Sequence, residues 1–60
     1  MQAGLPEDSV MLLSVINTKL RDDYPSLDAL CEEMDVPKEM LVEKLSVIDY
    51  EYDSNRNQFV

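Results

Sequence analysis

Apolar residues recur along the chain at the spacing of amphipathic helices. In the first predicted helix, either Asp8 or Ser9 can accept a hydrogen bond from the free backbone N–H groups of the opening turn. The apolar positions that follow fall on one face when successive residues are rotated by 100°: Leu12, Leu13, Ile16 and Leu20. Residues 22–25 end in proline and interrupt the pattern, so this helix is expected to stop there.

Two shorter helices are predicted to follow. Ser26 is a good N-cap for the second, whose core face repeats at i, i+3, i+4 and i+7: Leu27, Leu30, Cys31 and Met34. Asp35 suits a turn, and Pro37 suits the position at or just before the first turn of a third helix. The buried positions expected for that helix are Met40, Leu41, Leu45 and Ile48.

The C-terminal part of the chain changes to a period of two residues. Tyr50 and Tyr52 alternate with acidic residues, which predicts a strand, and residues 54–57 have the composition of a turn before residues 58–60 return. Because two strands alone are marginal in water, the hairpin must pack an aromatic residue on the helices. The predicted fold is therefore mainly α: a three-helix, helix-turn-helix-like domain over residues 8–60 with a short C-terminal β-hairpin, preceded by a flexible lead over residues 1–7.

Residues 30–41 resemble the helix-turn-helix pattern. Cys31 is the small residue after a leucine, Asp35 stands at the turn four positions later, and Val36 is the buried aliphatic residue that follows. Leu41 and Leu45 match the buried positions of the second helix of that motif. Asp35 departs from the pattern, in which glycine is usual. With a hairpin after the third helix, residues 26–60 resemble a miniature winged helix.

Three segments together resemble a narrower family. The residues at 11–22, 26–31 and 50–52 look like those of a family of short bacterial proteins catalogued as a domain of unknown function. The resemblance covers nearly the whole chain. It implies a compact helical domain, and it supplies neither an activity nor any functional residue.

The charge of the chain argues against nucleic acid as a partner. Thirteen acidic residues face five basic ones, which gives a formal net charge of −8 and repels phosphate backbones and anionic membrane surfaces. The outward positions of the predicted third helix are Lys38, Glu39, Val42, Glu43 and Ser46, whereas a helix that reads a DNA groove needs amide and cationic side chains. An accessory transcription regulator with a winged helix-turn-helix fold and weak DNA binding stays open as the alternative function.

No residue pattern favours an enzyme, a cofactor or a metal. The chain has no histidine, and its single cysteine, Cys31, lies on a predicted core face. Oxygen ligands alternate as in a calcium loop at Asp49, Glu51, Asp53, Asn55 and Asn57. Ser54 and Val60 stand where that loop needs glycine and glutamate, and the polar face of a strand gives the same alternation. We therefore expect a protein without catalytic, cofactor or metal residues.

An interaction or assembly module is the predicted function. The first helix carries Met11 and Val15 on the side away from its core face, near Thr18, and Val42 points outward on the third helix. Scattered exposed apolar residues are normal, so these positions are either ordinary surface or a docking face. The partner would be an unidentified protein or a second copy in a homodimer. Residues 1–8 lack the features of a signal peptide and no run is long enough to span a bilayer, so a cytoplasmic location without membrane contact is expected.

Overall fold

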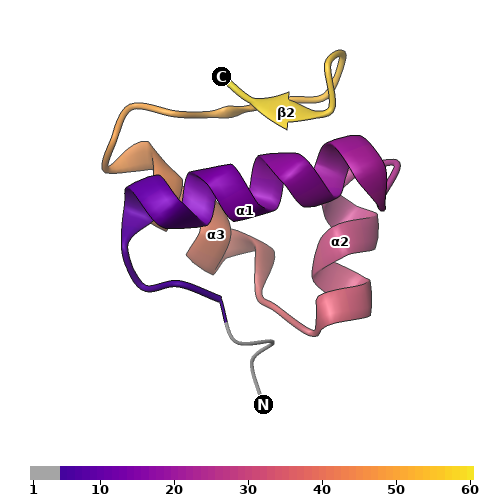
Figure 1. The fold of residues 1–60 in the computed structure, drawn as a ribbon, viewed down its shortest axis with the longest axis horizontal. Coiled ribbons are helices and arrows are strands. Elements are labelled where there is room, and N and C mark those ends of the chain that lie inside the picture. Colours follow the sequence, from indigo (N-terminus) through magenta and orange to yellow (C-terminus); the bar gives the residue numbers. More distant parts are fainter. Residues whose placement is uncertain (1–4) are drawn as a thin grey trace.

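The computed structural model describes residues 5–60, in which three helices and a two-stranded antiparallel sheet follow one another along the chain. The helices are α1 (Ser9–Asp22), α2 (Leu27–Met34) and α3 (Lys38–Ser46), and the strands are β1 (Tyr52–Asp53) and β2 (Gln58–Phe59). Figure 1 shows the hairpin along one side of α1, α2 on the other side, and α3 crossing behind α1. The predicted mainly α fold with a C-terminal hairpin is confirmed.

Side-chain caps set the start of the first two helices. Asp8 is the cap of α1, because its Oδ2 accepts a hydrogen bond from the backbone N–H of Met11 at 2.9 Å. Ser26 caps α2 in the same way, with its Oγ accepting from the N–H of Ala29 at 3.1 Å. These bonds satisfy backbone donors that have no partner inside the helix. The choice between Asp8 and Ser9 is thereby settled in favour of Asp8.

The link between α2 and α3 is a three-residue turn. Asp35 adopts the left-handed conformation, with φ 55° and ψ 50°, where aspartate is tolerated better than most residues other than glycine. Val36 is buried, and Pro37 stands immediately before α3 with an extended backbone. Proline lacks the N–H that would be unpaired at this position, so it fits there without loss of a hydrogen bond. The departure from glycine at position 35 therefore does not prevent the turn.

The core collects one face of each helix together with one aromatic residue of the hairpin. Its buried members are Leu12, Ile16, Leu20, Leu27, Leu30, Cys31, Val36, Leu41, Leu45 and Phe59. Four residues predicted as core are only partly buried and pack at its margin: Leu13, Met34, Met40 and Ile48. Ile48 was assigned to the third helix, but α3 ends at Ser46. The predicted faces are correct, and their edges lie closer to solvent than the periodicity indicates.

The hairpin is shorter at its first strand than the sequence predicts. Tyr52 is paired with Phe59, and the ring centroids of these two residues lie 5.6 Å apart. Tyr50 was predicted as a strand residue. Its N–H instead donates to the carbonyl oxygen of Leu45 at 3.0 Å, and 37% of its surface is exposed. The C-terminal carbonyl groups of α3 thus engage Tyr50 before the strand can begin, and the prediction for this residue is wrong.

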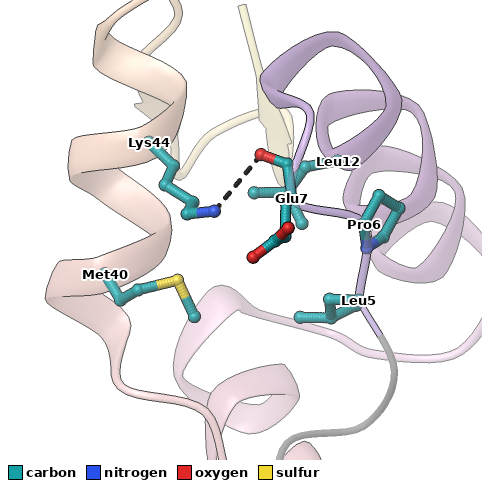
Figure 2. A pocket seen from close by; sticks show the side chains of 6 residues that line it. All are labelled: Leu5, Pro6, Glu7, Leu12, Met40 and Lys44. Carbon is teal, nitrogen blue, oxygen red and sulfur yellow. Dashed lines mark hydrogen bonds between the residues drawn. The ribbon is translucent and has the colours of Figure 1, made fainter.

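Residues 5–7 of the predicted lead contact the helices. Leu5 packs against the core, and the Nζ of Lys44 donates to the carbonyl oxygen of Glu7 at 3.2 Å, as Figure 2 shows. These contacts connect the approach to α1 with α3. Residues 1–4 of the predicted lead lie outside the described residues.

Candidate functional site

The four residues predicted as an interaction face lie on two helices. Met11 is 60% exposed on α1, where Val15 is half-buried and Thr18 is exposed. Val42 is 39% exposed on α3 and lines a shallow hollow of about 470 Å³ whose other residues also belong to α3. Val42 therefore does not share this hollow with the three residues of α1.

The surface around Val42 is acidic. We call the outward positions of α3 the outer α3 face: Lys38, Glu39, Val42, Glu43 and Ser46. The Nζ of Lys38 lies 2.9 Å from Oδ1 of Asp28, and this hydrogen bond raises the pKa of Lys38. Among the ion pairs of residues 5–60, none involves Glu39 or Glu43. The one cation of the outer α3 face is thus paired, and the two carboxylates beside Val42 are not.

Two hollows lie between residues of the outer α3 face and residues of β1 or next to it. One, at Lys38, has a volume of about 330 Å³, and the other, at Ser46, about 220 Å³. The first is lined by Pro25, Ser26, Leu27, Asp28, Lys38, Tyr52 and Ser54, and the second by Ser46, Asp49 and Glu51. Since Lys38, Val42 and Ser46 are four residues apart, they share one side of α3. We call the surface between this side and β1 the α3–β1 groove.

The rim of the α3–β1 groove carries mostly negative charge. Asp49 and Glu51 line one end, and Asp53 follows on β1. Arg56 lies 3.7 Å from Asp53, so this cation is close to a carboxylate, as Lys38 is at the other end. The arrangement suits a ligand that brings positive charge.

Side-chain amides that the sequence analysis did not single out attach the hairpin to α1. Oδ1 of Asn17 accepts from the N–H of Phe59 at 2.8 Å, and its Nδ2 donates to the carbonyl oxygen of the same residue at 3.1 Å. Gln58 adds a bond from its Nε2 to the carbonyl oxygen of Asn17 at 2.9 Å. Asparagine is a poor helix former, so its place in the middle of α1 was a signal of such a role.

Asn57 connects three elements at the far end of the hairpin. It is left-handed, with φ 54°, and its Nδ2 donates to the carbonyl oxygens of Leu20 and Tyr24, both at 2.9 Å. Its Oδ1 accepts from the hydroxyl of Tyr52 at 2.7 Å, and that hydroxyl in turn accepts from the N–H of Leu27 at 3.2 Å. These bonds hold the hairpin against α1 and α2, so the position of β1 beside the groove is well defined.

The residues that the sequence analysis considered for catalysis or metal binding are engaged in the core or in local hydrogen bonds. Cys31 is 8% exposed within the core, and this burial, together with the nearby carboxylate of Asp28, raises the pKa of its thiol. In the calcium-like series, Oδ1 of Asp53 accepts from the N–H of Asn55 at 2.9 Å, and the Asn57 amide is used as described above. Over residues 5–60 there is no cluster of three or more His, Cys, Asp or Glu side chains able to hold a metal ion.

A smaller hollow lies under the N-terminal segment. Figure 2 shows the residues that line it: Leu5, Pro6, Glu7, Leu12, Met40 and Lys44. Its volume is about 130 Å³, below the roughly 300–1,000 Å³ of ordinary small-molecule sites. The hollows at Lys38 and at Val42, of about 330 and 470 Å³, reach this range, so the surface around the outer α3 face is the better candidate for a functional site.

These features define a class of protein, a small mainly α domain whose C-terminal hairpin is attached across a three-helix core. The chain belongs to the family described as a domain of unknown function (DUF4250), whose model matches residues 6–59. The family resemblance seen in the sequence is thus confirmed. No curated protein and no solved structure matches the chain. Within the part that the structure describes, none of the helices has the length and apolar character needed to cross a membrane.

Proposed function

We propose that the domain is a non-catalytic protein-interaction module that binds its partner through the outer α3 face and the adjacent α3–β1 groove. One observation carries this proposal. Val42, 39% exposed, lines a hollow with Glu39 and Glu43, neither of which joins an ion pair among residues 5–60, while Lys38 is paired with Asp28. An apolar centre with a charged rim is the usual anatomy of a protein interface.

The same observation disfavours the alternative function, an accessory transcription regulator. A helix that enters a DNA groove gains affinity by neutralising phosphates and reads bases through amide or cationic side chains. Glu39 and Glu43 would be repelled by phosphates, and Val42 cannot donate a hydrogen bond to a base. A helix-turn-helix-like fold does not determine function by itself. The formal net charge of −8 instead favours association with a basic protein.

The proposed compartment is the cytoplasm. The chain has a single cysteine, Cys31, which is buried and free, so its stability does not rely on a disulfide, as is usual for proteins of reducing compartments. Assembly through a second copy, along Met11, Val15 and Thr18 of α1, remains a separate proposal because those residues lie outside the hollow at Val42.

Site-specific photo-crosslinking in the cell of origin tests the proposed function. A crosslinking residue at Val42 should capture one defined protein, whereas the same residue at exposed Glu33 of α2 should not. The captured protein is then purified, and its affinity is measured for two variants of equal charge change. Reversal of Glu39 and Glu43 to lysine should weaken binding at least tenfold, while reversal of Glu32 and Glu33 should leave it nearly unchanged. Equal losses in the two variants would contradict the assigned face.

A mobility-shift assay tests the alternative directly. We expect no complex between the wild-type domain and random duplex DNA at low salt. A salt-sensitive complex at micromolar protein, together with no protein captured at Val42, would replace the proposed function with that of an accessory DNA-binding regulator.

A further inference from the structure

The two edges of the hairpin differ in whether their outward backbone groups are hydrogen-bonded. Glu51 and Val60 exchange both backbone hydrogen bonds, at 3.0 and 2.8 Å, and Asp53 pairs with Gln58. In an antiparallel ladder the residues between such pairs direct their N–H and C=O groups outward. On β2 these are the groups of Phe59, and the Asn17 amide binds both.

The outward groups of β1 belong to Tyr52. They point away from β2, and among the hydrogen bonds of residues 5–60 none engages the Tyr52 N–H or C=O. One edge of the hairpin is thus closed by a side chain, and the other is open. An open edge is a template for another extended chain.

We propose that β1 accepts an extended basic segment of the partner protein as a third strand, beside the α3–β1 groove. The proposal rests on the proposed function and specifies its binding mode. Backbone bonds to Tyr52 supply the pairing. The hollow lined by Tyr52 and the hollow lined by Glu51 receive side chains from opposite faces of the added strand. Lysine or arginine side chains of that strand lie within the field of Asp49 and Glu51.

Charge selects this occupant over a second copy of the chain. If two β1 strands paired antiparallel about Tyr52, Glu51 of each copy would stand opposite Asp53 of the other. Like charges directly opposite in a sheet are destabilising. A basic strand instead places cations against the same two carboxylates, so the edge favours a basic partner and disfavours self-pairing.

Three synthetic hexapeptides serve as probes. The first alternates valine and lysine, the second has the same lysines but a central proline that cannot donate a hydrogen bond, and the third replaces lysine by glutamate. In titrations of ¹⁵N-labelled full-length protein, the first peptide should shift the amide signals of residues 51–54 and of Lys38, Val42 and Ser46. It should also slow hydrogen exchange at the Tyr52 amide. The proline and glutamate peptides should do neither.

A backbone substitution isolates the strand pairing. The 60-residue chain can be made by chemical synthesis with an ester in place of the Tyr52 amide. The ester removes the outward donor and also weakens the Glu51 carbonyl, which accepts from the N–H of Val60 at 2.8 Å, so the unfolding free energy of the ester protein is measured beside its affinity to separate the two effects. Affinity for the valine–lysine peptide should fall about three- to tenfold, the effect of losing one net hydrogen bond. Glu51→Lys should weaken binding at least as much, and Glu33→Lys should leave it unchanged.

The outcomes separate the two proposals. If Val42 captures a partner but neither that partner nor the valine–lysine peptide protects the Tyr52 amide, strand addition is wrong and the interaction module stands. Signal shifts confined to Met11, Val15 and Thr18 would also overturn strand addition. Protection of the Tyr52 amide without any peptide, in a dimer that Met11→Asp does not dissociate, would assign the edge to a second copy and overturn the basic partner.

Discussion

Replacing Asn17 with alanine should detach the hairpin from α1 while the helices keep their packing. The Asn17 amide is bound to both backbone groups of Phe59, at 2.8 and 3.1 Å. Alanine removes both bonds at once and leaves two partly buried backbone groups with only water as a partner. Since Phe59 is 2% exposed in the core, its displacement would also expose an aromatic ring.

The expected loss of unfolding free energy follows from the two hydrogen bonds between Asn17 and Phe59. Each contributes about 0.5–1.5 kcal/mol net, so their loss costs about 1–3 kcal/mol. Alanine is a better helix former than asparagine by up to about 0.7 kcal/mol, which offsets part of this loss. The unfolding free energy should therefore fall by about 0.3–2.3 kcal/mol, with a central value of about 1.3 kcal/mol. That is a large share of the roughly 3–5 kcal/mol expected for a domain of this size.

Urea denaturation followed by circular dichroism measures this loss, and hydrogen exchange at the Phe59 amide locates it. Exposed Glu33 of α2 provides the control, because Glu33→Ala should change the unfolding free energy by no more than about 0.5 kcal/mol. If Asn17→Ala unfolds at the same urea concentration as the parent and the Phe59 amide stays protected, the Asn17 amide does not attach the hairpin.

Three further predictions concern the core, the thiol and self-association. Leu41→Ala should cost about 2–5 kcal/mol and leave the domain largely unfolded at room temperature, while Val42→Ala should stay within about 0.5 kcal/mol of the parent. If thermal melts showed Val42→Ala to be less stable than Leu41→Ala, the assigned faces of α3 would be wrong. Native Cys31 should react slowly with thiol reagents. Burial raises the pKa of the Cys31 thiol above its ordinary value of 9.0, so the folded state holds the proton longer than the unfolded chain. The contribution of Cys31 to the unfolding free energy is complete below pH 9.0 and is lost as pH rises through the folded pKa. Cys31→Ala should remove this part of the alkaline loss of stability. Light scattering should show a dimer that Met11→Asp dissociates, and a monomeric parent would rule out the α1 contact.

Helix positions were largely predictable because their signals are local. A cap such as Asp8 or Ser26 bonds an N–H three residues away, and an apolar period marks a core face without knowledge of what packs on it. Cys31 was placed in the core for the same reason, and the structure has it there. The sequence by itself therefore determined the helices, their inner faces, the turn at Asp35 and the presence of a hairpin.

Only the tertiary structure decided how these parts meet. Tyr50 looked like a strand residue, but a carbonyl group of α3 binds its N–H first, and no local pattern reports that competition. The bonds of Asn17 to Phe59 join residues 42 positions apart, so periodicity could not reveal them. The same packing left the β1 edge at Tyr52 open and separated Val42 from the α1 stripe. Periodicity alone indicated the outer α3 face, but hydrogen bonding across long sequence distances depends on the final arrangement of all elements, and this is why the open β1 edge emerged only from the folded chain.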